Sequence, residues 1–317
     1  MDMVTDTVTV TVRTITDTDT VHPKKNNSSG MIKNTNDNED WTLIVRPQVR
    51  WFDINLKDLW NYRDLIMLFV KRDFVAVYKQ TILGPLWYLI QPVLTAITYT
   101  IIFGQIAKIS TGDLPKLLFY LSGVTMWNYF SECLNKTSNT FISNSNVFGK
   151  VYFPRLTVPV SIIISNLISF FIQFALFIIV LLCYYPSYSS VIHPNKYMLL
   201  LPVLILIMAG LGLGLGIIIS SVTTKYRDLR FLISFGIQLL MFATPVIYPL
   251  SILSEKKKML ILANPLSSVV ETFRFAFTGS GELHWGYLLY SFIFMIVVMF
   301  TGILLFNRVE KSFMDTV

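Results

Sequence analysis

Long apolar stretches alternate with short polar segments between residues 86 and 306. Six of these stretches approach or exceed the roughly 20 apolar residues that an α-helix needs to cross a bilayer. They cover residues 86–106, 117–134, 158–185, 198–222, 231–250 and 287–306. Within them, Glu132 is the single Asp, Glu, Lys or Arg. The pattern predicts an all-α integral membrane protein with six transmembrane helices.

An amphipathic helical pattern precedes the first span, over residues 56–80. A period of 3.6 residues separates an apolar side from a charged side. The apolar side contains Leu59, Tyr62, Ile66, Phe69, Val70 and Val77, and the polar side contains Lys57, Asp58, Asn61, Asp64, Lys71, Arg72 and Lys79. Such a helix lies in the membrane plane with its polar side toward the cytosol. Gly84-Pro85 ends the helix, because proline cannot continue the hydrogen-bond ladder. A core helix of a soluble domain is the alternative, and the apolar run that follows disfavours it.

Composition agrees with a membrane protein. Hydrophobic residues make up 53% of the chain and charged residues 14%, with a mean hydropathy of +0.57; soluble domains carry about 25% charged residues. Residues 1–40 are rich in Thr, Asp and Asn, so we expect a disordered cytosolic tail without a secretory signal. Residues 41–84 form an interfacial segment with the amphipathic helix, and residues 85–317 form the membrane domain.

Charge favours an inner N-terminus. Residues 1–40 carry a net charge of −3 and residues 41–317 a net charge of +10. In a membrane protein, the positive charge of residues 41–317 indicates contact with anionic lipid headgroups rather than with nucleic acid. Six spans place both termini on one side, and the positive-inside rule puts that side in the cytosol. The loop 251–286 does not follow this rule, since it is assigned to the outer side and carries three consecutive lysines, 256–258, and Arg274. Residues 253–263 and 265–277 of this loop each favour a short helix, which predicts a re-entrant outer pair whose second helix dips into the outer leaflet.

Polar residues recur at helical spacing inside three spans. These stripes are Tyr88, Gln91, Thr95 and Tyr99; Ser161, Ser165, Ser169 and Gln173; and Ser234, Gln238, Met241 and Tyr248. Polar groups avoid lipid, so the stripes face protein or water. One interpretation is the wall of a pathway for a polar solute, with the tyrosines and Trp127, Tyr129 and Phe130 offering flat faces to sugar rings. The other is packing between helices, and both stay open.

Two further segments carry recognisable patterns. In the fourth span, four alternate glycines, 210, 212, 214 and 216, predict close helix packing. Between the second and third spans, residues 144–155 form a short amphipathic cytosolic piece. We expect its aromatic side chains Phe148, Tyr152 and Phe153 to be exposed and to need a partner, the alternative being a plain connector.

Motifs for catalysis are missing from the sequence. No G-x-x-x-x-G-K-[ST] occurs, so we expect no nucleotide hydrolysis by this chain. The three histidines are isolated, and no acids cluster at metal-ligand spacing, so we predict neither a metal site nor an enzyme.

Several short motifs, in this order, resemble the membrane subunit of ABC-2 type polysaccharide exporters, the O-antigen and teichoic-acid exporter group. The motifs are Leu59-Trp60, Tyr62-Arg63-Asp64, Arg72-Asp73, Tyr78-Lys79-Gln80-Thr81, Leu83-Gly84, Trp87, Gln91-Pro92, Phe103-Gly104, Phe153-Pro154-Arg155 with Pro159, Tyr226-Arg227-Asp228, Pro245-Val246-Ile247-Tyr248, Asn264-Pro265, and Glu310 with Phe313. The resemblance covers roughly residues 41–317, and the tail 1–40 departs from it.

The resemblance implies a homodimer of six-span subunits of the type V exporter fold, in the bacterial inner membrane, above two separate ATPase subunits that bind ATP and Mg. It implies outward movement of a polyprenyl-diphosphate-linked glycan, with no cofactor in this chain. By similarity, residues 56–80 are the interface helix, residues 144–155 contain the coupling helix and residues 251–286 form the outer gate helices. The interface residues are Arg72, Asp73, Tyr78 and Lys79, and the coupling residues are Phe148, Lys150, Tyr152, Phe153 and Arg155. A drug or lipid exporter of the same fold is the alternative. A polyprenyl-phosphate enzyme or an ion-coupled carrier would need acids or histidines inside the spans, and only Glu132 qualifies.

Overall fold

The computed structural model describes residues 56–79, 84–148, 153–223 and 228–314, and in these ranges the chain is helical without a β-strand. The predicted amphipathic helix is present as α1 (Leu56–Asn61) and α2 (Arg63–Lys79). Ile66, Phe69 and Val70 are buried, as the periodicity predicts, and α2 packs on α7 (Thr157–Tyr184). Part of the apolar side therefore contacts protein.

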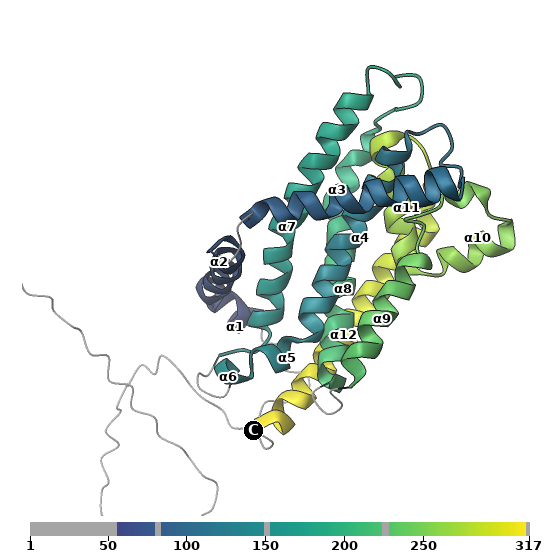
Figure 1. Ribbon diagram of the computed structural model, residues 1–317. Helices are drawn as coiled ribbons and strands as arrows, with labels where there is room; N and C mark the ends of the chain where they lie inside the picture. Colours follow the sequence, from purple (N-terminus) through teal and green to yellow (C-terminus); the bar gives the residue numbers. More distant parts are fainter. Residues whose placement is uncertain (1–55, 80–83, 149–152, 224–227, 315–317) are drawn as a thin grey trace, which may run out of the picture. The chain divides into compact units, whose positions relative to one another are not determined.

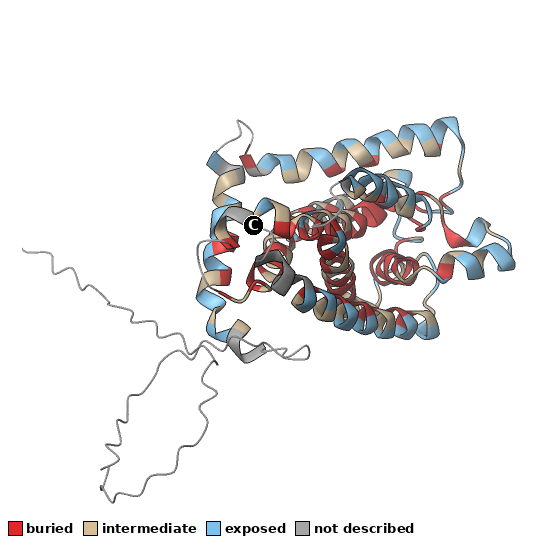
Figure 2. Cartoon of the chain, turned by 90° about the horizontal axis from the view of Figure 1, so that it is seen from below, coloured by how far each residue is buried: buried red, intermediate tan, exposed pale blue. Residues whose placement is uncertain are grey.

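Helix α8 (Leu201–Thr223) lies at the centre of the bundle, preceded by the short η3 (Lys196–Leu200). It packs along both α4 (Lys116–Ser138) and α12 (Trp285–Met314), and α4 also packs along α7 (Figure 1). Seen from the end of the bundle, buried residues gather on the central helices and exposed residues on the outer ones (Figure 2). The core is thus formed by α4, α8 and α11 (Pro265–Thr278) together with the inward sides of α7 and α12.

The four alternate glycines of α8 point in pairs toward its two main neighbours. A methyl group on Gly210 would clash with Met295 of α12, and one on Gly214 would lie 2.9 Å from the Met299 backbone nitrogen. On the opposite side, a methyl group on Gly212 would lie 2.7 Å from Cβ of Cys133, and one on Gly216 would lie 2.5 Å from Cβ of Thr137. The stripe therefore permits close approach of α4 and α12, which confirms the packing prediction.

Helix α3 (Trp87–Tyr99) continues into the π-helical segment η2 (Thr100–Ile106) and runs across the α4 and α7 axes (Figure 1). It begins at η1 (Gly84–Leu86), where Gly84 has a φ of +48°, a backbone conformation that favours glycine. This turn separates α3 from α2, as the Gly84-Pro85 pair predicts.

Four helical stretches among the described residues are long and apolar enough to span a bilayer: Trp87–Ile106, Thr157–Tyr184, Lys196–Thr223 and Trp285–Arg308. The predicted second span corresponds to α4, which is long but more polar. The predicted fifth span is a continuous helix only in part, because α9 (Leu229–Phe242) has 14 residues. That length rises about 21 Å, short of a roughly 30 Å hydrocarbon core. Six helices therefore overlap the six predicted segments, and four of them meet the criteria for a span, so the number of six spans stays a prediction.

Two short helices, α5 (Thr140–Ser143) and α6 (Ser145–Phe148), follow α4. After α9 come η4 (Leu250–Ile252), α10 (Glu255–Leu262) and α11 (Pro265–Thr278), so the predicted pair of short helices is confirmed. Asn264 caps α11 by accepting a hydrogen bond from the Leu266 amide, and Gly279 ends it with a φ of +75°. Helix α11 is buried against α4, α8 and α12, so it is a core element rather than a lipid-facing one.

Candidate functional site

One side of α4 is polar along its C-terminal half. Its side chains recur every three or four residues and are exposed or half-buried, whereas the other sides of the helix are packed in the core. We call this surface the α4 polar face; it consists of Asn128, Ser131, Glu132, Asn135, Lys136 and Asn139. It is the side of α4 that the bundle leaves partly uncovered.

The α4 polar face holds an ion pair connected to α7. The Lys136 Nζ atom lies 3.0 Å from Oε2 of Glu132 and donates a hydrogen bond of 2.8 Å to Oδ1 of Asn166, which is buried. One turn deeper, Asn128 Nδ2 donates to Gln173 Oε1 at 3.2 Å. The Glu132 and Lys136 side chains are 47% and 48% exposed. Half-exposed charges are costly in contact with lipid, so this face requires water or protein beside it.

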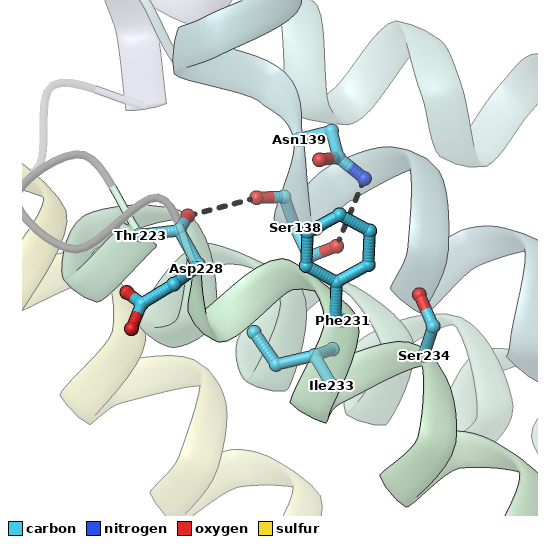
Figure 3. Close-up of a pocket in the computed structure, with 7 residues that line it drawn as sticks. All are labelled: Ser138, Asn139, Thr223, Asp228, Phe231, Ile233 and Ser234. Carbon is cyan, nitrogen blue, oxygen red and sulfur yellow. Dashed lines mark hydrogen bonds between the residues drawn. The ribbon is translucent and has the colours of Figure 1, made fainter.

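A pocket of about 500 Å³ lies where α4, α8 and α9 meet, next to the end of the α4 polar face (Figure 3). Five of its seven lining residues are polar, and the lining consists of Ser138, Asn139, Thr223, Asp228, Phe231, Ile233 and Ser234. Thr223 Oγ1 donates to the Ser138 carbonyl oxygen, and Asn139 Nδ2 donates to Ser138 Oγ, both at 3.4 Å. The pocket extends the polar surface to one end of the bundle.

The predicted pathway residues of the first and fifth spans meet at one point. Tyr99 OH on α3 donates to Met241 Sδ on α9 at 3.4 Å, and Tyr248 OH donates to the Phe242 carbonyl oxygen at 3.0 Å in the turn that follows α9. Gln238 is exposed, one turn before Met241. Tyr99 and Tyr248 are half-buried, so this group lies partly open.

The other stripe residues of α3 lie toward its start. Gln91 is exposed, and Tyr88 and Thr95 are half-buried. Thr95 Oγ1 donates to the Gln91 carbonyl oxygen at 2.9 Å, which is a bond within the helix. These three side chains leave one side of α3 accessible.

Trp127 and Tyr129 do not lie on an open surface. Their side chains are 5% and 3% exposed, with Trp127 against Phe130 and Tyr129 against Phe170 of α7. The prediction that they present flat faces to a solute is therefore wrong for this arrangement. Helical geometry explains the error: both residues flank the polar positions of α4 and point into the core instead.

The prediction of exposed aromatic side chains in residues 144–155 is also wrong for the two that the structure describes. Phe148 and Phe153 are 3% and 5% exposed, and their ring centroids are 5.7 Å apart. They join Phe69 of α2 and Phe141 in a second core cluster, to which Phe306 of α12 also belongs. An apolar residue in a short connector is buried here because α2 and α12 lie close enough to cover it.

The remaining coupling residues are placed only in part. Arg155 is buried, and its guanidinium lies 5.6 Å from the Phe148 ring centroid. Lys150 and Tyr152 lie outside the described residues. The described part of residues 144–155 thus packs against the bundle.

On the predicted interface helix, Arg72 and Asp73 form an ion pair of 2.8 Å near the surface, and the Arg72 guanidinium lies 4.8 Å from the Phe69 ring centroid. Lys79 is exposed, and the Tyr78 side chain lies outside the described residues. Positive charge is therefore available on the open side of α2.

The sequence stripes did not include the α4 polar face, although a signal for it was present. The predicted second span contains Asn128, Ser131 and Glu132, and Asn135, Lys136 and Asn139 follow at the same spacing beyond its end. The apolar run ends at residue 134, so the sequence pattern divides this stripe between a span and the loop that follows it.

Comparison with known proteins agrees with this architecture. Residues 64–278 match the family profile of the ABC-2 type transporter, and the chain belongs to this family of transporter membrane subunits. It is 26% identical over 254 residues to two O-antigen export system permease proteins RfbA from Klebsiella pneumoniae, covering 80% of this chain and 94% of each relative. It is 27% identical over 224 residues to RfbA from Myxococcus xanthus, covering 70% and 83%. The predicted family is therefore confirmed, and the chain is a multi-pass membrane permease related to O-antigen exporters.

Proposed function

We propose that this chain is the transmembrane subunit of an ABC transporter that exports a polyprenyl-diphosphate-linked polysaccharide across the bacterial inner membrane. A separate ATPase subunit binds ATP and Mg and supplies the energy. Two lines of support combine here: the relatives are named O-antigen export permeases, and α4 presents hydroxyl, amide and charged groups within an apolar bundle. The α4 polar face is the observation that carries the proposal.

The chemistry of this face suits a glycan better than a drug or a lipid. Amides and hydroxyls donate and accept hydrogen bonds at every turn of the helix, and sugar hydroxyls do the same. An apolar cargo would displace water from these groups without offering hydrogen bonds in exchange, which costs free energy. A drug or lipid exporter with this fold would therefore be expected to carry an apolar α4 surface.

A homodimer follows from the need to cover this surface. The α4 polar face cannot contact lipid, because charged and polar side chains are unfavourable there. A second copy of the chain placed against it would enclose a water-filled pathway between two polar faces. Helix α9 lies beside α4 with Phe231, Phe235 and Leu239 exposed, which supplies apolar surface for such a contact or for lipid. In this arrangement both termini are cytosolic.

Replacement of polar-face residues tests the proposal. Asn135→Leu and Ser131→Leu remove hydrogen-bonding groups at half-buried positions without adding charge. Each is expected to lower export about fivefold, the equivalent of about 1 kcal/mol. The readout is the amount of surface polysaccharide in cells whose chromosomal copy is deleted, normalised to the amount of permease in the membrane.

Val297→Leu on α12 is the matched control, because Val297 is 54% exposed on an apolar surface. It is expected to leave export unchanged. Equal loss in the control and in both polar-face variants, or no loss in any, would contradict the proposed pathway. Purified alone, the chain is expected to show no Mg-dependent ATP turnover. Turnover that survives removal of copurifying ATPases would contradict the proposal that a separate subunit hydrolyses ATP.

A further inference from the structure

A shallow apolar groove lies between α10 and the start of α12, away from the α4 polar face. Its volume is about 510 Å³, and it is lined by Met259, Ala263, Gly286, Tyr287 and Tyr290. Tyr290 OH donates a hydrogen bond of 3.2 Å to the Ala263 carbonyl oxygen, which joins the two helices along the groove. Because the groove is apolar, it suits a hydrocarbon chain.

Positive charge lies at the end of this groove. Lys256 is three and seven residues before Met259 and Ala263, so helical geometry places it on the same side of α10 as the groove. Lys258 points elsewhere and is paired with Glu282. Lys256 and Lys257 are exposed and form no ion pair with any residue in the described part of the chain. The Lys256 ammonium therefore borders the apolar groove, and Lys257 adds a second positive charge at the next position of α10.

The surroundings have the composition of a membrane interface. Trp285 and Tyr290 are 56% and 40% exposed, and tryptophan and tyrosine side chains favour the headgroup level of a bilayer. Met259 and Leu260 on α10 are exposed beside the lysines, as in helices that lie at a membrane surface. In Figure 1, α10 projects from the bundle near the start of α12, at the end opposite α5 and α6.

We infer that this groove binds an anionic phospholipid. The phosphate contacts the Lys256 ammonium, Lys257 adds to the positive charge around it, and one acyl chain occupies the groove between Met259 and Tyr290. Beyond the groove the chain follows the exposed apolar surface of α12 through Ile293. Charge at one end and hydrocarbon along the length match a phospholipid, whereas a free phosphate ion would leave the apolar groove unused. The site is separate from the proposed export pathway.

Native mass spectrometry of the full chain in detergent tests the site, with phosphatidylglycerol and phosphatidylcholine of the same acyl chains as probes. The wild-type chain is expected to retain phosphatidylglycerol in preference to phosphatidylcholine. Lys256→Ala combined with Lys257→Ala is expected to weaken phosphatidylglycerol binding by roughly 25-fold, since each lysine near an anionic lipid contributes about a factor of five. Phosphatidylcholine binding should not change. Lys108→Ala with Lys196→Ala, two exposed lysines outside α10, is the charge-matched control and is expected to have no effect.

A second variant tests the groove itself. A Cβ on Gly286 would meet no atom within 4 Å. Gly286 lines the groove, so the larger side chain of Gly286→Leu takes up space there and is expected to reduce binding of both lipids. Gly236 on α9 is equally open, and Gly236→Leu is expected to leave binding unchanged. Absence of a preference for phosphatidylglycerol, unchanged binding in the α10 double variant, or full displacement of the lipid by inorganic phosphate would each overturn the inference.

Discussion

Arg274 and Glu271 lie one turn apart on α11, and their Nη1 and Oε2 atoms are 2.7 Å apart with both side chains buried. Arg274 also donates to Ser122 Oγ on α4 at 3.3 Å and to the Pro245 carbonyl oxygen, after α9, at 3.0 Å. Its guanidinium lies 3.8 Å from the Phe119 ring centroid. A single side chain thus connects α11 with α4 and with the turn that follows α9.

Removal of this arginine is expected to destabilise the protein strongly. Arg274→Met leaves the Glu271 carboxylate buried without its partner, which typically costs about 3–5 kcal/mol of the free energy of unfolding. Adding Glu271→Leu is expected to recover much of the loss, because no unpaired charge then remains. The measurement is the thermal unfolding midpoint in detergent.

Arg72→Ala provides the comparison, since it breaks an ion pair whose side chains are 47% and 32% exposed. Surface pairs contribute little, so the unfolding midpoint of this variant should stay close to that of the wild type. If Arg274→Met is no less stable than Arg72→Ala, the connecting role of Arg274 is wrong.

The contact between α8 and α12 leads to a second prediction. A methyl group on Gly214 would lie 2.9 Å from a backbone atom of Met299, which cannot move as a flexible side chain can. Gly214→Ala is therefore expected to lower the free energy of unfolding by about 1–3 kcal/mol. Gly236→Ala is the matched control, because its Cβ meets no atom within 4 Å, and alanine favours a helix over glycine. A midpoint for Gly214→Ala equal to or above that of Gly236→Ala would contradict the close packing.

A third prediction concerns pH and the attachment of α10. The hydrogen bond from Lys258 lowers the pKa of Glu282, and the same bond raises the pKa of Lys258. His284 Nε2 lies 2.7 Å from the same carboxylate oxygen. Because the Glu282 carboxyl has a lower pKa in the folded chain, the pair stabilises the fold fully above the carboxyl pKa of the unfolded chain, about 4.3. This contribution is lost as the pH falls through the pKa of Glu282 in the folded chain.

Hydrogen exchange of the α10 amides measures this attachment. Protection is expected to be steady through neutral pH and to fall below about pH 4, once rates are corrected for intrinsic exchange. Glu282→Gln is expected to show the reduced protection already at neutral pH. Full protection of α10 in Glu282→Gln would show that other contacts hold the helix.

The helices were more predictable from the sequence than the surfaces they present. Apolar length and the 3.6 period indicate α3, α7, α8 and α12, and the Asn264-Pro265 pair marks the start of α11, because these signals are local. The sequence does not indicate the end of α9 at Phe242, since residues 243–250 are as apolar as a span. They form a turn in which the Pro245 carbonyl oxygen accepts a hydrogen bond from Arg274 of α11. Apolarity alone does not separate a membrane helix from a buried turn.

The site was predicted less well, because the position of a side chain around a helix depends on the neighbours that the helix acquires. Trp127 and Asn128 are adjacent in sequence, yet the first is buried and the second lies on the α4 polar face. Phe148 looks exposed in a short polar connector and is covered by α12, more than 150 residues away in the chain. Contacts of this kind are set by the tertiary fold and leave little trace in local periodicity.

In the proposed function, the α4 polar face contacts the moving glycan. Site-specific photo-crosslinking tests this contact directly, with a photoreactive phenylalanine analogue placed at Ser131 or Asn135, and at Ile296 on the exposed apolar side of α12. Cells that export a radiolabelled polysaccharide are irradiated, and label attached to the permease is measured. We expect label at positions 131 and 135 and little at 296, with the signal lost when glycan synthesis is blocked. Equal labelling at all three positions, or label at 296 alone, would contradict a pathway along α4.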